Sequence, residues 1–131
     1  MEVTVRFRTA DRFDVVLKVR TSHPTLQIQL LGMGVKGRYQ LTNGILTWQV
    51  SGRAPVLETI KWLRTRTLTS DQRAMIAYAH QLLGEWAKLH RDNTPARLKL
   101  IEKMRRFNNE SGVSSGRTSI LGGGFNPGAI V

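Results

Sequence analysis

The chain has 131 residues, no cysteine and a formal net charge of +11, with 20 Lys and Arg against nine Asp and Glu. This length suits one domain with an appendage, and the lack of Cys excludes disulfides and thiolate metal sites. The three His fit no metal-ligand spacing, and no stretch approaches the roughly 20 apolar residues of a membrane span. We therefore expect no metal, no cofactor, no membrane partner and no secretory signal.

Positive charge is spread along the whole chain. Eight Lys and Arg stand against three Asp and Glu in residues 1–53 (+5), and eleven against six in residues 54–111 (+5). Nucleic acid is the default partner of such a basic domain, and a merely solvated surface is the alternative. We expect the protein in the cytoplasm, associated with nucleic acid, or in a virus particle.

The first fifty residues alternate apolar and polar side chains, which is typical of strands with one buried face. The pattern predicts an antiparallel β-meander with strands at about 2–9, 13–21, 25–31, 35–42 and 45–51. Asn43-Gly44 predicts a type I′ hairpin between the last two, because both central residues need positive φ. The apolar set expected to point inward is Val3, Val5, Phe7, Val15, Leu17, Val19, Leu26, Ile28, Leu30, Leu46, Trp48 and Val50.

After residue 52 the pattern changes to a helical period. Pro55 in a first turn predicts a helix to about Arg64. Thr69 and Gln72 form a capping box at the start of a second helix. Its apolar stripe is Met75, Ile76, Ala79, Leu82, Leu83 and Trp86.

A third helix is expected to begin with Thr94 as N-cap and Pro95 in the first position. It should end near Phe107, before a run of Asn, Ser and Gly. Its inward residues should be Leu98, Ile101, Met104 and Phe107. Strands followed by helices predict an α+β domain over residues 1–111, with the β-meander in 1–53 and helices in 54–111, and a C-terminal arm in 112–131.

The polar face of the predicted sheet is rich in cations and poor in acids. Its basic residues are Arg6, Arg8, Lys18, Arg20, Lys36 and Arg38, and its amides and hydroxyls include Gln27, Gln29, Gln40, Thr47 and Gln49. Side chains in such rows can follow a phosphate backbone with little sequence preference. Tyr39 alternates against the cations and is expected to be buried, which favours backbone contacts over base stacking. An ordinary solvated face is the alternative.

The third helix offers a second basic stripe, formed by Lys99, Lys103 and Arg106 at helical spacing. A solvated helix face, with cations complementing the helix dipole, explains this stripe equally well. Both basic surfaces are therefore candidates for contact with nucleic acid.

The sequence contains no pattern that indicates catalysis. We find no paired carboxylates, no Ser-His-Asp arrangement and no Cys nucleophile, and His80 is expected to be packed or partly exposed on its helix. The protein is therefore predicted not to be an enzyme.

The C-terminal stretch SILGGGFNPGAIV suggests a hydrophobic arm. Pro127 stands where a phosphate-binding glycine loop needs its third Gly, and no strand precedes the run. Phe125, Ile130 and Val131 are expected to anchor the arm on another copy or another subunit. Two functions thus stand: a non-catalytic nucleic-acid-binding accessory protein, or a structural subunit of a virus or phage particle or another large assembly.

Overall fold

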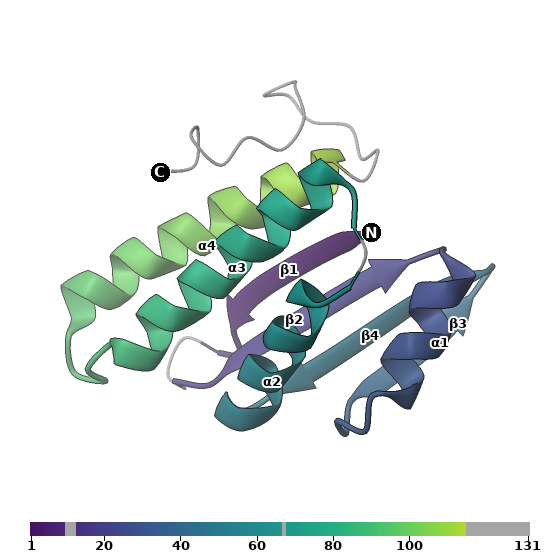
Figure 1. Ribbon diagram of the computed structural model, residues 1–131. Coiled ribbons are helices and arrows are strands. Elements are labelled where there is room, and N and C mark those ends of the chain that lie inside the picture. The colour runs from purple at the N-terminus through teal and green to yellow at the C-terminus, as the bar shows by residue number, and fades with distance from the viewer. Residues whose placement is uncertain (10–12, 67, 115–131) are drawn as a thin grey trace.

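The protein is an α+β structure built on one antiparallel sheet, as the sequence predicts. The computed structural model describes residues 1–9, 13–66 and 68–114 (Figure 1). The strands are β1 (Glu2–Phe7), β2 (Val15–Thr21), β3 (Arg38–Thr42) and β4 (Ile45–Ser51). The helices are α1 (Pro24–Gly32), α2 (Arg53–Arg64), α3 (Ser70–Lys88) and α4 (Thr94–Ser114).

The strands lie in the order β1-β2-β4-β3, and every neighbouring pair is antiparallel. The hairpins β1–β2 and β3–β4 join through the pairing of β2 with β4, which leaves β1 and β3 at the edges. The predicted five-strand meander is wrong. Helix α1 forms the connection between β2 and β3. The β3–β4 hairpin therefore joins the sheet through β4, which pairs with β2.

The segment expected as a third strand, residues 25–31, is helix α1. Leu26 and Leu30, four residues apart, are buried, whereas Ile28 between them is 73% exposed. Pro24 occupies the first turn, where its fixed φ is compatible with a helix. The run Leu-Gln-Ile-Gln-Leu contains both a period of two and an i, i+4 pair, so alternation over five residues does not separate strand from helix.

The glutamines of this segment consequently lie on α1 and not on the polar face of the sheet, where Gln27 and Gln29 were predicted. The Gln27 amide donates to the carbonyls of Thr21 and Gly44, both at 2.9 Å, and so holds α1 against the β3–β4 turn. That turn confirms the hairpin prediction, because Asn43 and Gly44 have φ values of 53° and 77°.

Helices α2 and α3 agree with the sequence patterns. α2 begins at Arg53, close to the expected start. α3 begins after a complete capping box, in which the backbone of Gln72 donates to the Thr69 hydroxyl and the backbone of Thr69 donates to the Gln72 side chain, each at 3.2 Å. Reciprocal capping satisfies two backbone N–H groups that the first turn leaves without helical partners.

The two ends of α4 differ from the prediction. The backbone N–H of Ala96 donates to Oδ1 of Asn93 at 3.2 Å, so Asn93 supplies the cap expected from Thr94. The helix also continues to Ser114 instead of ending near Phe107, and it passes the expected domain boundary at residue 111. The polar run does not end the helix because two of its side chains bind strand β1.

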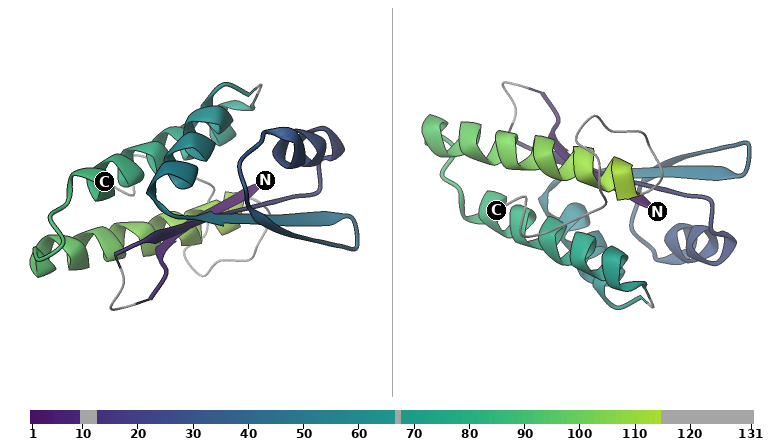
Figure 2. Two further views of the ribbon diagram at one scale, coloured as in Figure 1. Left: turned by 90° about the horizontal axis from the view of Figure 1, so that it is seen from below. Right: turned by 90° about the horizontal axis from the view of Figure 1, so that it is seen from above.

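Helices α1, α2 and α3 cover one face of the sheet, as both views of Figure 2 show. The core between them includes Leu17 of β2, Trp48 of β4, Ile60 of α2 and Leu83 of α3, all fully or almost fully buried. Of the apolar residues expected to point inward from the first fifty, all except Ile28 belong to this core or pack against it.

Three other residues expected inside are exposed. Tyr39, which is 64% exposed, lies on β3, an edge strand on which every residue is exposed. Leu98 and Ile101 are exposed because α4 lies beside the sheet and turns Leu100 to the core, together with Met104 and Phe107, which are buried as predicted. Burial in α4 therefore follows its position at the sheet edge.

Helix α4 packs along strand β1 and closes this edge of the sheet. The Asn108 amide accepts from the backbone N–H of Val5 at 2.8 Å and donates to the Val5 carbonyl at 3.0 Å. The Ser111 hydroxyl accepts from the N–H of Val3 at 2.8 Å. These side chains satisfy edge groups that would otherwise be open to pairing with another strand.

Replacing Asn108 by Ala is expected to lower the free energy of unfolding by about 1–2 kcal/mol, because both backbone groups of Val5 lose a partly buried partner. Urea unfolding followed by circular dichroism measures this change. Asn109→Ala is the matched control, and we expect it to change the free energy by less than about 0.5 kcal/mol. Equal effects of the two substitutions would contradict the edge-closing function of Asn108.

Candidate nucleic-acid interface

The sheet face opposite α1, α2 and α3 is left uncovered by the described residues (Figure 2). Strand register arranges its side chains in rows, with Lys18 opposite Gln49 and Gln49 opposite Arg38. In the next row Arg6 lies opposite Val16. The structure thus brings together the cations predicted from the strands: Arg6, Arg8, Lys18, Arg20, Lys36 and Arg38.

Four of these cations surround a hollow of about 420 Å³, here called the basic hollow. Arg6 and Arg8 approach it from the β1 side, and Lys36 and Arg38 approach it from the β3 side. Its floor comes from the central strands and includes Val16, Gln49 and Ser51. No Asp or Glu lies among the described residues that line it. The carboxylate of Asp14, which is not among these lining residues, pairs with Arg8.

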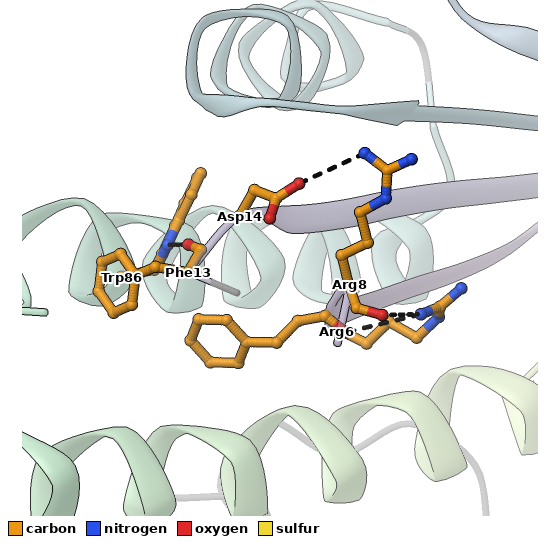
Figure 3. A network of polar contacts seen from close by, with 6 residues as sticks. Arg6, Arg8, Phe13, Asp14 and Trp86 are labelled. Carbon is orange, nitrogen blue, oxygen red and sulfur yellow. Dashed lines mark hydrogen bonds and ion pairs between the residues drawn. The ribbon is translucent and has the colours of Figure 1, made fainter. Parts of the chain in front are cut away.

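Arg6 and Arg8 are held differently, as Figure 3 shows. The Arg6 guanidinium donates to the carbonyls of Phe7 and Arg8, at 3.5 and 3.3 Å. Arg8 forms an ion pair with Asp14 at 3.6 Å, in which its side chain remains 46% exposed. Solvent weakens a pair of this kind, so Arg8 can exchange Asp14 for a stronger anion.

The remaining cations of the face differ in their pairing. Arg20 lies 3.9 Å from Glu2. Lys18, Lys36 and Arg38 have no carboxylate within ion-pair distance in the part of the chain that the structure describes. Among the described residues, positive charge is thus least compensated on the β3 side of the basic hollow, at Lys36 and Arg38, and at Lys18 on strand β2.

Two hydrogen bonds fix the end of the β1–β2 hairpin near the basic hollow. The indole N–H of Trp86 in α3 donates to the Phe13 carbonyl at 2.8 Å (Figure 3). The backbone N–H of Arg8 donates to the Asp14 carbonyl at 2.9 Å. The helical layer therefore restrains the backbone that carries Arg8.

Gly37 allows the two cations on either side of it to approach the sheet. A Cβ at this position would lie 2.5 Å from Cε2 of Trp48 and 2.8 Å from the carbonyl oxygen of Gln49. Lys36 and Arg38 therefore depend on a residue without a side chain. The sequence contains no local signal for this requirement, because the contact is with the neighbouring strand.

The stripe predicted on α4 lies elsewhere. Lys103 forms an ion pair with Glu85 of α3 at 3.0 Å, and Arg106 lies 3.5 Å from Glu102. Lys99 is exposed on the same helix. Because Lys103 faces α3, the stripe belongs to the helical side of the molecule and is partly neutralised there.

Among the described residues, the titratable groups with clear pKa shifts lie on the helices. Burial raises the pKa of Tyr78, and burial together with the nearby cations Arg64 and Lys61 lowers the pKa of His80. The Arg64 guanidinium lies 2.8 Å from Nδ1 of His80, so this histidine links α2 to α3. A hydrogen bond from Arg105 lowers the pKa of the Glu102 carboxyl.

The remaining sequence-based expectations concern the C-terminal arm, a membrane span and a metal site. The anchors Phe125, Ile130 and Val131 lie outside the described residues, and the arm remains a prediction. Among residues 1–9, 13–66 and 68–114, no helix is long and apolar enough to cross a membrane. In the same ranges no three acidic or His side chains gather as a metal site would require.

Comparison with known proteins adds little. No protein-family model matches the chain, and no curated protein matches it. Among solved structures, the chain is similar to the homing endonuclease I-CvuI, crystallised with its target (Sro1.3) in the presence of 2 mM Ca. The two share 14% identity over 89% of this chain and 77% of that one, with a TM-score of 0.46, which is too low to establish a common fold.

Proposed function

We propose that the protein binds DNA or RNA, with little sequence preference, through phosphate contacts in the basic hollow. The observation that carries this proposal is the gathering of four cations around one hollow, with no carboxylate among the described residues that line it. Lys18 and Arg20 extend the positive surface along β2.

The electrostatics favour a polyanion. Like charges placed around one hollow raise each other's free energy unless an anion enters, and phosphates carried on one chain supply several anions at once. Arg also offers a planar fork that matches two phosphate oxygens, and the hollow holds Arg on both sides. A surface selected only for solubility intersperses both signs of charge, unlike the lining of this hollow.

The lining also supports sequence tolerance and the absence of catalysis. Apart from cations, the described residues of the lining offer Val, Gly, the amide of Gln49 and the hydroxyl of Ser51, and no aromatic ring on which a base would stack. Its described lining offers no His, Asp or Glu that would exchange a proton with a substrate. We therefore propose binding without turnover at this surface.

A fluorescence anisotropy titration with labelled single-stranded and duplex oligonucleotides tests the proposal. If about four phosphates are neutralised, log K should fall with log salt at a slope of about −3 to −4. Absence of binding at about 50 mM salt, where phosphate contacts are strong, would refute the proposed function.

A further inference from the structure

A second hollow lies between β1 and α4, next to the basic hollow. It measures about 390 Å³, and we call it the apolar hollow. Its apolar lining is Val5 and Phe7 from β1 with Ile101 and Met104 from α4. Its volume falls within the range of small-ligand pockets, which are mostly apolar with a few polar groups at defined places.

The polar groups around the apolar hollow are already held in place. The Asn108 amide binds the backbone of Val5, and Arg105 is fixed by Glu102 through contacts of 2.7 and 2.8 Å. The charged head of Arg105 stays at the surface, with 76% of its side chain exposed. An occupant therefore meets apolar walls inside and guanidinium groups at the rim.

Phe7 is held by its neighbours as well. Its ring centre lies 5.7 Å from that of Phe13, and the Arg97 guanidinium lies 4.6 Å above it. Arg97 also donates to the Thr9 carbonyl at 3.4 Å. A ring held from two sides forms a fixed part of the wall, so little ordering of the wall is needed when an occupant binds.

Arg6 lines both hollows, and its guanidinium donates to the carbonyl of Phe7, which lines the apolar hollow, and to that of Arg8, which lines the basic hollow. A phosphate held at Arg6 would thus bring the adjoining nucleoside to the mouth of the apolar hollow. A nucleobase has two apolar faces and a polar edge, which fits apolar walls with donors at the rim.

We infer that the apolar hollow receives one unpaired nucleobase of a strand whose phosphates lie in the basic hollow. This inference rests on the proposed function and makes it more specific. A base held in a Watson–Crick pair is stacked and unavailable, so the protein should prefer single strands to duplex.

The test compares a single strand with an abasic strand of the same length, which keeps every phosphate. Stacking of one base predicts about tenfold weaker binding of the abasic strand by the unaltered protein, with an unchanged salt slope. Equal affinities would overturn the base site and leave the phosphate proposal standing. Failure of both strands to bind would overturn both proposals.

The substitution Ile101→Asn tests whether the base lies in the apolar hollow, and Leu98→Asn on the same helix is its matched control. Both positions are exposed apolar residues of α4, but of the two only Ile101 lines the apolar hollow. We expect Ile101→Asn to reduce the tenfold preference to about twofold and Leu98→Asn to leave it intact. If both variants lost this preference for the intact strand equally, the assignment of the base to the apolar hollow would be overturned. The comparison of the two strands with the unaltered protein does not depend on either variant.

Discussion

Replacing both Arg6 and Arg38 by Glu is expected to weaken binding of a single-stranded oligonucleotide by about 100-fold at low salt. The two residues stand on opposite sides of the basic hollow, so one phosphate path contacts both. A hydrogen bond to a charged group contributes about 1.5–3 kcal/mol, and two such losses reach or exceed this factor before repulsion by the new carboxylates is added. Anisotropy titration measures the effect.

The matched control is Lys61→Glu with Lys99→Glu, which changes the net charge equally on the helical layer. Both lysines are exposed. Lys103 is a poorer choice, because a Glu at that position would face Glu85 and destabilise the α3–α4 contact. The control should weaken binding by no more than about threefold through the general loss of charge. A larger loss in the control than in the sheet variant, with both folded, would mean that the wrong surface has been assigned.

Gly37→Ala is expected to lower the free energy of unfolding by about 3 kcal/mol, the upper end of the usual overpacking range. The new methyl group would meet the buried Trp48 ring and the backbone carbonyl of Gln49 at once, so β3 would have to move from β4. Because Lys36 and Arg38 flank this position, binding should weaken as well. Urea unfolding and the anisotropy titration follow the two effects.

Gly84→Ala is the control for this substitution. Gly84 lies inside α3, and a Cβ there meets nothing within 4 Å. Replacing a helical Gly by Ala should therefore raise the free energy of unfolding by about 0.5–1 kcal/mol. A Gly37→Ala protein as stable as the unaltered one would show that β3 does not lie against Trp48 as described.

Local sequence signals predicted those parts of the fold that depend on neighbours in the chain. The Asn43-Gly44 turn and the Thr69–Gln72 capping box each involve residues a few positions apart, and both occur in the structure. Helix α1 was missed because Leu26 and Leu30 satisfy either period. Once α1 replaces a strand, the pairing of β2 with β4 is decided by packing between distant segments.

The candidate site likewise has features that follow from local sequence and features that depend on distant segments. Alternation correctly placed Arg6, Lys18 and Arg38 on one polar face, because side chains two apart in a strand share a face. The hollow itself depends on strand order, and its need for Gly37 depends on Trp48. Exposure of Ile101 likewise follows from α4 lying beside β1, so the apolar hollow could not be derived from helical periodicity alone.

The most direct test of phosphate binding in the basic hollow is the salt slope of a charge-neutralised variant. Arg6, Lys36 and Arg38 are replaced together by Ala, and log K for a single strand is plotted against log salt beside the unaltered protein. Each lost phosphate contact on a single strand should reduce the slope by about 0.7, so three losses should make it shallower by about 2. Parallel lines for the two proteins would contradict phosphate binding in the basic hollow, because its cations would then displace no counterions from the nucleic acid.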